Sequence, residues 1–243
     1  MKALIVAAGK GERINTSGEV KPKPLYFCGG QYLIGHVITR LRSAGITEIV
    51  IVVGFMGDLI QRALGDGSQF DVKIEYVNNS EFDKANGWSV FQARHLLSEP
   101  FILSMSDHVF EPAIVQQFVN FMSRNKGNYL CTDRKLNLIS DMDDATKVRE
   151  ENGKIIRIHK KLEQFNTVDC GMFFLTPDFF RALVIRQKQG DFSITGGVQQ
   201  LADEGSMKTY DLQNGLWVDV DTRRELAIAE EHLLLAAQKR EHF

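Results

Sequence analysis

A buried strand that runs directly into a glycine loop is the feature that most limits the fold of this chain. An apolar run spans Ala3 to Ala8 and is followed at once by Gly9, Gly11 and Arg13. A strand that is apolar at every position is typical of a parallel sheet covered on both faces. Glycines let backbone N–H groups approach an anion closely, and an arginine adds positive charge. The segment therefore predicts an α/β protein whose first strand ends at an anion site; the alternative is a surface loop with incidental basic residues.

The loop matches neither of two common phosphate-binding motifs. A P-loop and a dinucleotide fingerprint would both need a further glycine at position 14, which is Ile14. The dinucleotide fold also needs an acid near the end of the second strand, where residues 53–55 are Val-Gly-Phe. Hydride-transfer chemistry therefore loses support.

A basic residue held between two prolines follows the loop. Pro22 and Pro24 restrict the backbone on both sides of Lys23, whereas Lys21 lies before the restricted segment. We therefore expect Lys23, rather than Lys21, to be fixed toward the loop, where its charge would meet an anion.

Apolar runs and helix-spaced apolar patterns alternate through the first half of the chain, and a second series follows. Strands are expected at 2–8, 48–53, 72–77 and 101–105, and helices at 32–44, 57–64, 88–97 and 112–123. Farther along we expect a hairpin at 145–159 that turns at Asn152 and Gly153, and strands at 168–175, 208–212 and 217–220. Helices are expected from 177, at 193–204 and at 222–239, the last with Thr222 as N-cap and Glu225 in the capping-box position. The pattern predicts one Rossmann-like α/β domain over 1–243, with a mixed, mostly parallel sheet flanked by helices.

Composition restricts the partners and the compartment. A formal net charge of -2 gives no basic excess, which argues against a nucleic-acid surface. Cys28, Cys131 and Cys170 form no C-x-x-C pair and no disulfide framework, and three scattered thiols fit a reducing cytosol. No apolar stretch approaches the roughly 20 residues of a membrane span, and charge follows the first apolar run too soon for a signal peptide. We expect a cytoplasmic protein that neither inserts into a membrane nor binds nucleic acid.

Three carboxylates lie near the predicted ends of strands. Asp107 follows the strand at 101–105, where open α/β sheets bind their ligands. Asp219 and Asp221 flank one residue of an extended segment, so both side chains point the same way. The neighbouring sequence has no basic residues to pair all three acids, so a divalent cation is expected there. The alternatives are that Asp107 caps a turn before Pro112 and that Asp221 caps the last helix.

Other polar residues have both a functional and an ordinary explanation. Asn86 to Ser89 open a helix, where they either contact a ligand or simply cap the helix. Lys147 and Lys160 lie on the predicted hairpin and are either anion ligands or solvated surface lysines. His108 adjoins an acid and is either a metal ligand or, more commonly, a support for that acid.

Taken in order, these motifs resemble a known superfamily. Residues 7–13 (Ala-Ala-Gly-x-Gly-x-Arg), followed by 22–25 (Pro-Lys-Pro-Leu), look like the signature of nucleotidyltransferases with the GT-A-like Rossmann fold. The later motifs most resemble cytidylyltransferases that make CDP-inositol from inositol 1-phosphate, including forms fused to a membrane CDP-alcohol phosphotransferase. These motifs lie at 86–89, 105–109, 145–148, 168–171 and 217–222.

The resemblance implies a role for each matching residue. The nucleotide would be bound by Ala7, Ala8, Gly9, Gly11, Arg13, Lys23, Asn86, Ser89 and Asp107. Magnesium would be held by Asp107, Asp219 and Asp221, and the acceptor by Lys147, Lys160, Asp169 and Gly171. Arg13, Lys23 and Lys160 would act in catalysis. Nucleotide binding would then fall mainly in 1–110 and acceptor binding mainly in 111–243.

The implied reaction transfers CMP from CTP to a phosphorylated alcohol, with inositol 1-phosphate favoured, and releases pyrophosphate. A phosphate monoester is largely dianionic at neutral pH, so positioning and charge neutralisation suffice without a protein nucleophile. A GT-A glycosyltransferase is disfavoured, because the segment Ser106-Asp107-His108 lacks the first acid of its Asp-x-Asp motif. A non-enzymatic nucleotide sensor or scaffold is the other alternative, and a homodimer stays open as the assembly.

Two departures from the family pattern leave the acceptor open. His159 and Cys170 replace the residues expected beside the acceptor, which keeps a sugar 1-phosphate, phosphocholine and aminoethylphosphonate as alternatives. An inositol ring needs several hydrogen-bonding side chains. A cationic acceptor favours an acidic or aromatic cage, to which Asp169 and Phe173 would contribute.

Overall fold

The computed structural model describes residues 1–15 and 20–241. The strands of its main sheet are β1 (Ala3–Ala7), β4 (Glu48–Val53), β5 (Lys73–Asn78), β6 (Phe101–Met105), β8 (Asn128–Asp133), β9 (Lys147–Glu151), β10 (Lys154–His159), β11 (Thr167–Leu175) and β12 (Met207–Asp211). The helices are α1 (Leu33–Ser43), α2 (Gly57–Leu64), α3 (Asn86–Gln92), α4 (Pro112–Met122), α5 (Asp178–Gln187), α6 (Ile194–Asp203) and α7 (Arg223–Glu241). Two small sheets pair β2 (Phe27–Cys28) with β3 (Gln31–Tyr32) and β7 (His108–Phe110) with β13 (Trp217–Asp219).

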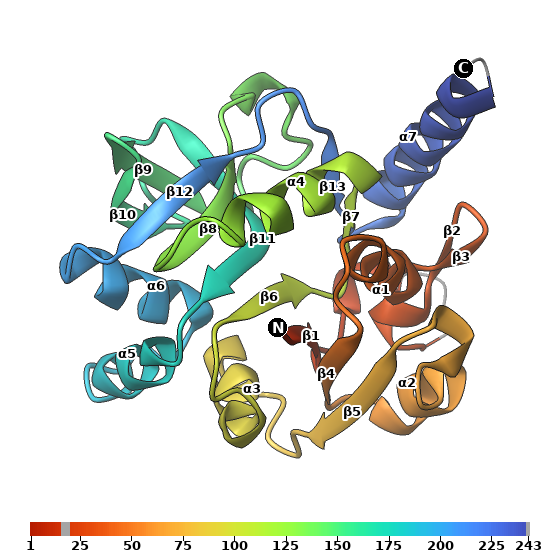
Figure 1. The fold of residues 1–243 in the computed structure, drawn as a ribbon, viewed down its shortest axis with the longest axis horizontal. Helices are drawn as coiled ribbons and strands as arrows, with labels where there is room; N and C mark the ends of the chain where they lie inside the picture. The colour runs from red at the N-terminus through yellow and green to blue at the C-terminus, as the bar shows by residue number, and fades with distance from the viewer. Residues whose placement is uncertain (16–19, 242–243) are drawn as a thin grey trace.

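One nine-stranded sheet runs through both halves of the chain, in the order β5-β4-β1-β6-β11-β8-β12-β10-β9 (Figure 1). β10 and β11 run opposite to the other strands. The expected mixed sheet flanked by helices is therefore confirmed; seven of its nine strands point the same way, but five of its nine pairings are antiparallel. That nucleotide binding falls mainly in 1–110 and acceptor binding mainly in 111–243 stays a prediction.

The side chains of β1 alternate between two hydrophobic layers. Ala3 and Ile5 belong to a cluster that includes residues of α1, α2 and α4, whereas Leu4 and Val6 belong to a cluster that includes residues of α3, α5 and α6. Helices therefore cover both faces of the sheet, and every residue of β1 is buried. This double coverage is the physical reason for the unbroken apolar run in the sequence.

The glycine loop that follows β1 lies at the point where the order in which strands are added to the sheet changes direction. β1 pairs in parallel with β4 on one side and with β6 on the other. The chain moves outward from β1 through β4 to β5 and then returns to β6, so the carboxyl ends of β1 and β6 adjoin. Ligands of open α/β sheets bind at such switch points.

Two turn and cap predictions are confirmed. The β9–β10 hairpin turns at Asn152 and Gly153, whose φ angles of 53° and 74° are those of a type I′ turn. At the start of α7, Oγ1 of Thr222 accepts from N of Arg224 at 3.2 Å, and Oε2 of Glu225 accepts from N of Thr222 at 3.0 Å. This is the expected capping box, so the alternative in which Asp221 caps the last helix is wrong.

Three elements differ from the expectations. The helix expected at 88–97 ends as α3 at Gln92, and a separate turn follows at Arg94–Leu96. β8 is fully buried yet was not expected, because its short mixed run, Asn-Tyr-Leu-Cys-Thr-Asp, has neither helical nor strand periodicity. β7 has only three residues and forms through its pairing with β13.

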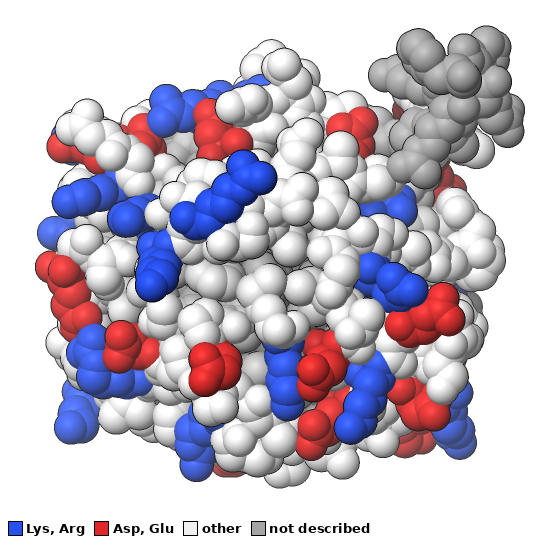
Figure 2. All heavy atoms as spheres, in the orientation of Figure 1, with Lys and Arg blue, Asp and Glu red and all other residues white. Residues whose placement is uncertain are grey.

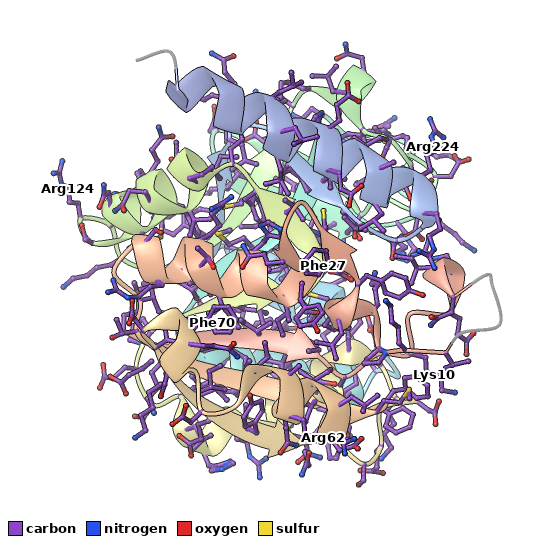
Figure 3. The ribbon with its side chains drawn as sticks, turned by 90° about the vertical axis from the view of Figure 1, so that its right-hand side faces the viewer. Lys10, Phe27, Arg62, Phe70, Arg124 and Arg224 are labelled. Carbon is purple, nitrogen blue, oxygen red and sulfur yellow. The ribbon has the colours of Figure 1, made fainter. Side chains whose placement is uncertain are left out.

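The surface shows a mixture of charges and one projecting helix. On the face shown in Figure 2, basic and acidic side chains are interspersed, in keeping with the small net charge. α7 extends away from the sheet, and Phe27 on β2 lies between α1 and α7 in Figure 3. Within the described part of the chain, none of the helices combines the length and apolarity that crossing a bilayer requires.

Candidate active site

A cleft of about 540 Å³ opens at the carboxyl ends of β1 and β6. The loop after β1, the turn after β6, the start of α3 and residues 82–84 form its walls. Of the residues predicted to bind nucleotide, those that line the cleft are Ala7, Gly9, Gly11, Arg13, Lys23, Asn86, Ser89 and Asp107. Ala8 is the exception, because its side chain is buried in the core behind the loop.

The conformation of the loop depends on Gly11. This glycine has a φ of 59°, and a Cβ atom at its position would lie 2.5 Å from Cβ of Lys23. Nδ2 of Asn15 donates to the carbonyls of Gly11 and Lys21 at 3.2 Å each, which ties the two sides of the loop together. Only glycine therefore satisfies both the backbone angle and the close passage of the lysine.

The ammonium of Lys23 lies buried between two carboxylates. It contacts Oδ2 of Asp107 and lies 2.6 Å from Oδ1 of Asp221. Burial alone would lower the pKa of Lys23, but the charges of these acids outweigh it and raise the pKa above its usual value. Lys21 instead places its ammonium 4.3 Å from the ring centre of Tyr26. The predicted difference in orientation between the two lysines is confirmed.

Charged groups of alternating sign cross the site in one continuous series, which we call the charge ladder. Nη2 of Arg13 lies 2.7 Å from Oδ2 of Asp221 and 3.0 Å from Oδ2 of Asp144, whose Oδ1 lies 2.6 Å from Nζ of Lys160. The charge ladder consists of Lys160, Asp144, Arg13, Asp221, Lys23, Asp107 and His108. Asp107 and Asp221 are thus partly neutralised by Arg13 and Lys23, which come from a distant segment of the chain.

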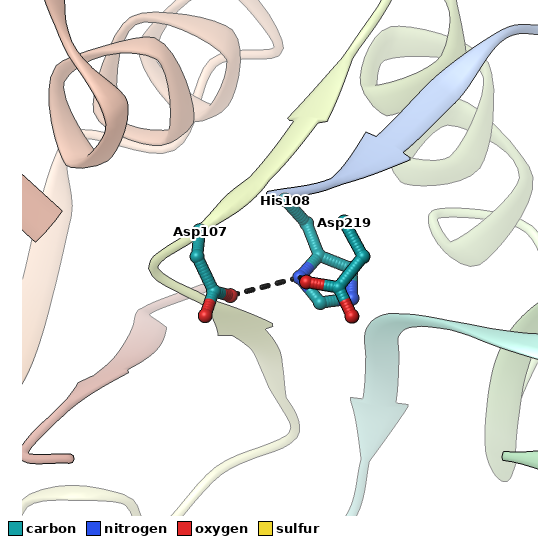
Figure 4. Close-up of side chains that lie close together, drawn as sticks. All are labelled: Asp107, His108 and Asp219. Carbon is teal, nitrogen blue, oxygen red and sulfur yellow. Dashed lines mark hydrogen bonds and ion pairs between the residues drawn. The ribbon is translucent and has the colours of Figure 1, made fainter. Parts of the chain in front are cut away.

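His108 supports two of the predicted metal ligands (Figure 4). Its Nδ1 lies 2.9 Å from Oδ1 of Asp107 and 3.6 Å from Oδ1 of Asp219. The imidazole stacks on Trp217 at a centroid distance of 5.5 Å, and Nε1 of Trp217 donates to Oδ2 of Asp133 at 2.9 Å. Burial alone would lower the pKa of His108, but Asp219 and Asp107 raise it to about 9. Nδ1 of His108 already contacts Asp107, and magnesium prefers oxygen ligands, so the structure favours the support explanation.

The carboxylates have the chemistry that a magnesium ion requires. Oxygens of Asp107 and Asp219 and a ring nitrogen of His108 lie within 4.8 Å of one another. Oδ1 of Asp219 is buried and has no hydrogen-bond partner among the described residues, and burial raises the pKa of this carboxyl to about 7. A nearby cation would pair with the unpartnered oxygen and would offset the cost of burying its charge. Carboxylate oxygens are also the protein ligands that magnesium prefers. Asp221 lies on the other side of Lys23 and is not part of this cluster, so its predicted role as a third metal ligand stays a prediction.

The Asn86 to Ser89 motif connects the cleft to the helices beneath it. Oδ1 of Asn86 accepts from N of Ile194 at 2.9 Å, and Oγ of Ser89 accepts from Nδ2 of Asn79 at 2.9 Å. The capping explanation is wrong, because α3 begins at Asn86 without a side-chain cap. Both residues line the cleft, and their contact with a nucleotide stays a prediction.

A second cavity of about 70 Å³ adjoins the cleft and shares Asp221 with it. Its acidic lining residues are Asp141, Asp144, Asp169, Asp219, Asp221 and Glu225. Trp217 and His232 also line it. Asp169, which is predicted to bind the acceptor, therefore lines this second cavity.

Asp169 and Gly171 lie where the pairing of β11 is irregular, and Gly171 is beside His108. Oδ1 of Asp169 accepts from N of Gly171 at 2.7 Å, and burial raises the pKa of Asp169 to about 6 despite this bond. Gly171 has a φ of 71°, and a Cβ atom there would lie 2.5 Å from the imidazole of His108. Gly171 therefore sets the position of the supporting histidine through its small size.

The two hairpin lysines lie outside the lining of both cavities. Nζ of Lys147 donates to the carbonyls of Met142, Asp143 and Ala145 at 2.6, 3.3 and 3.3 Å, so it holds the segment before β9. Lys160 is half-exposed, and its ammonium is paired with Asp144, which lines the second cavity. Their predicted roles toward an acceptor stay predictions.

Sequence reasoning missed Asp144 and Trp217. Asp144 belongs to an acidic run at 141–144 that directly precedes the motif at 145–148, which is the signal that would have found it. Trp217 begins the last motif and was read only as part of it. Its stacking on His108 depends on the pairing of β7 with β13.

The fold and the site define an α/β protein with a cleft bordered by a glycine loop at a switch point of the sheet and a cluster of carboxylates beside it. The sequence matches the Nucleotidyl transferase family over residues 2–235. The chain belongs to this family, and it is therefore an enzyme that transfers a nucleotidyl group.

Two curated relatives and one solved structure are similar to this chain over most of its length. The "Bifunctional IPC transferase and DIPP synthase" of Archaeoglobus fulgidus is 33% identical over 239 residues, which are 98% of this chain and 45% of the relative. The protein of the same description from Rubrobacter xylanophilus is 30% identical over 236 residues, 96% of this chain and 52% of the relative. The chain thus spans about half the length of these relatives. The solved inositol-1-phosphate CTP transferase from T. maritima is 26% identical, with a TM-score of 0.85 over 97% of this chain and 95% of that one.

Proposed function

We propose that this chain transfers CMP from CTP to inositol 1-phosphate and releases pyrophosphate. The observation that carries the proposal is the meeting of two cavities at Asp221, one lined by the glycine loop and the other by carboxylates. The similarity to the T. maritima inositol-1-phosphate CTP transferase supports both the donor and the acceptor.

The larger cleft suits the triphosphate. Gly9, Gly11, Arg13 and Lys23 border it, and the backbone N–H groups of the glycines and the two cationic side chains are the donors these residues offer. These groups would hold the triphosphate and neutralise charge as pyrophosphate leaves, which is the main task of the protein in such a transfer. The acceptor phosphate is already a dianion near neutral pH, so no side chain has to remove a proton from it.

Asp107, Asp219 and Asp221 are the residues that would hold magnesium. A bound magnesium ion supplies charge neutralisation on the phosphate oxygens during nucleotidyl transfer. His108 would keep Asp107 and Asp219 at a fixed separation, because its ring is confined between Trp217 and Gly171.

The second cavity suits a ligand rich in hydrogen-bond donors. Its carboxylates accept hydrogen bonds, and the ring hydroxyls of an inositol phosphate donate them. Each buried hydroxyl left without a partner would cost roughly 1–3 kcal/mol, so the number of acceptors matters. The face of Trp217 offers an apolar surface beside them.

A cationic acceptor such as phosphocholine or aminoethylphosphonate is the second candidate. The same carboxylates, with Trp217, would attract an ammonium group. The cage contribution expected of Phe173 is wrong, because Phe173 is buried in the core and lies outside the cavity lining.

A pyrophosphate-release assay separates these candidates. Each of the four nucleoside triphosphates is combined with inositol 1-phosphate, phosphocholine, aminoethylphosphonate or glucose 1-phosphate. CTP with inositol 1-phosphate is expected to give the highest kcat/KM. If another acceptor exceeds inositol 1-phosphate by about tenfold or more, which corresponds to roughly 1.4 kcal/mol, the proposed acceptor is wrong.

A further inference from the structure

Asp144 joins two cations that come from different parts of the chain. Its Oδ2 lies 3.0 Å from Nη2 of Arg13 on the loop after β1, and its Oδ1 lies 2.6 Å from Nζ of Lys160 just after β10. Each carboxylate oxygen thus accepts from one cation. Arg13 lines the cleft and Asp144 lines the second cavity, so the carboxylate lies at the junction of the two.

The backbone around Asp144 is anchored independently of these cations. N of Asp144 donates to Oδ1 of Asp141 at 3.1 Å. Nζ of Lys147 binds the carbonyls of Met142 and Ala145 on either side. The backbone that carries Asp144 is therefore held by its own segment, and its carboxylate is paired with the longer side chains of Arg13 and Lys160.

The position of this carboxylate is one that a phosphate group would take. Arginine and lysine donors bind carboxylate and phosphate oxygens with the same charge-assisted geometry. A substrate phosphate and Asp144 therefore compete for the same N–H groups. Partial burial opposes ionisation, but the hydrogen bonds from Lys160 and Arg13 lower the pKa of Asp144, so the acid is charged at neutral pH.

We propose that Asp144 is an internal counterion, a built-in competitor that occupies Arg13 and Lys160 whenever no substrate phosphate does. Entry of a phosphate displaces the carboxylate from these donors. The return of the carboxylate to them favours departure of the pyrophosphate product. The inference rests on the proposed function only in that both cations bind phosphate groups.

Calorimetric titration with inorganic pyrophosphate tests the competition without CTP or any acceptor. The Asp144→Asn variant is expected to bind pyrophosphate about tenfold more tightly than the unsubstituted protein, since a competing charge has been removed. Asp143→Asn is the matched control: it removes a neighbouring exposed charge whose side chain makes no hydrogen bond or ion pair with the described residues. Asp144→Glu keeps the charge and is expected to bind pyrophosphate as the unsubstituted protein does.

A gain of affinity distinguishes competition from a merely structural role, because loss of structure weakens binding. Equal or weaker pyrophosphate binding by Asp144→Asn overturns the proposal, and so does an equal gain in Asp143→Asn. If Asp144→Asn unfolds, Asp144→Ser is titrated under the same criterion. Absence of binding in every variant also overturns it. The proposed function is tested separately by turnover, so failure of one does not imply failure of the other.

Discussion

Nζ of Lys23 lies 2.6 Å from Oδ1 of Asp221, although 198 positions separate the two residues in the chain. The same ammonium contacts Asp107 after β6. One buried lysine therefore links the loop after β1, the turn after β6 and the segment after β13. The three segments form the site only when all of them are in place, which explains why substitutions at this point are expected to affect both turnover and stability.

Replacing Asp107 is expected to abolish most of the turnover. Asp107→Asn keeps the shape but removes a charge predicted to hold magnesium, and a hundredfold or greater fall in kcat is expected from losing roughly 3 kcal/mol of charge stabilisation. Pyrophosphate release is measured across a magnesium titration, with the exposed Asp58→Asn on α2 as control. Full activity of Asp107→Asn, or activity of the unsubstituted protein in excess chelator, contradicts the metal prediction.

Lys23→Ala is expected to cripple catalysis, whereas Lys21→Ala has a mild effect. Removing Lys23 also leaves Asp107 and Asp221 without their shared buried partner, a change that typically destabilises by about 3–5 kcal/mol. Among the described residues, the side chain of Lys21 has only its ring contact with Tyr26 to lose. Steady-state kinetics and urea unfolding of both variants check the contrast. Equal losses of kcat and of stability in Lys21→Ala and Lys23→Ala would mean that the two lysines belong to a diffuse basic patch.

The buried carboxyl of Asp169 is expected to make the protein less stable as the pH rises. Its pKa is raised from 3.8 to about 6, so the folded state resists ionisation. The stabilising contribution of the neutral acid is complete below about pH 4 and is lost as the pH passes 6. Asp169→Asn stays neutral and still accepts from Gly171, so it should be the more stable protein above about pH 6, by at most about 3 kcal/mol.

Urea unfolding at several pH values checks this sign. The two proteins should have equal stability near pH 4 and separate between about pH 4 and 6. A constant difference across the range would mean that ionisation of Asp169 is not its cause.

Gly171→Ala is expected to reduce both stability and turnover. A Cβ atom there would lie 2.5 Å from the imidazole of His108, which is confined against Trp217. Gly153 is a matched control, because its φ of 74° is close to the 71° of Gly171 but no atom lies within 4 Å of its Cβ position. Both substitutions incur about 1 kcal/mol of backbone strain. Only Gly171→Ala should add roughly 1–3 kcal/mol of overpacking and lower kcat.

Local sequence was enough to locate the elements that hold the site. β1 is apolar at every position because helices cover both faces of the sheet, so its pattern does not depend on which partners it has. The turn at Asn152 and Gly153 and the capping box at Thr222 and Glu225 are likewise set by a few adjacent residues. The prolines beside Lys23 restrict its backbone locally, so the difference from Lys21 was also predictable.

Tertiary structure alone decided which charges meet. The contacts of Asp144 with Arg13 and Lys160 join segments 131 and 16 positions apart, and no local pattern records them. β7 is a strand only because β13 pairs with it, and that pairing places Asp219 beside His108. A short strand gains too little from its own residues to form alone. Charge pairing depends on distance in space, whereas propensity acts along the chain, so sequence identified the ionic groups of this protein and folding selected their partners.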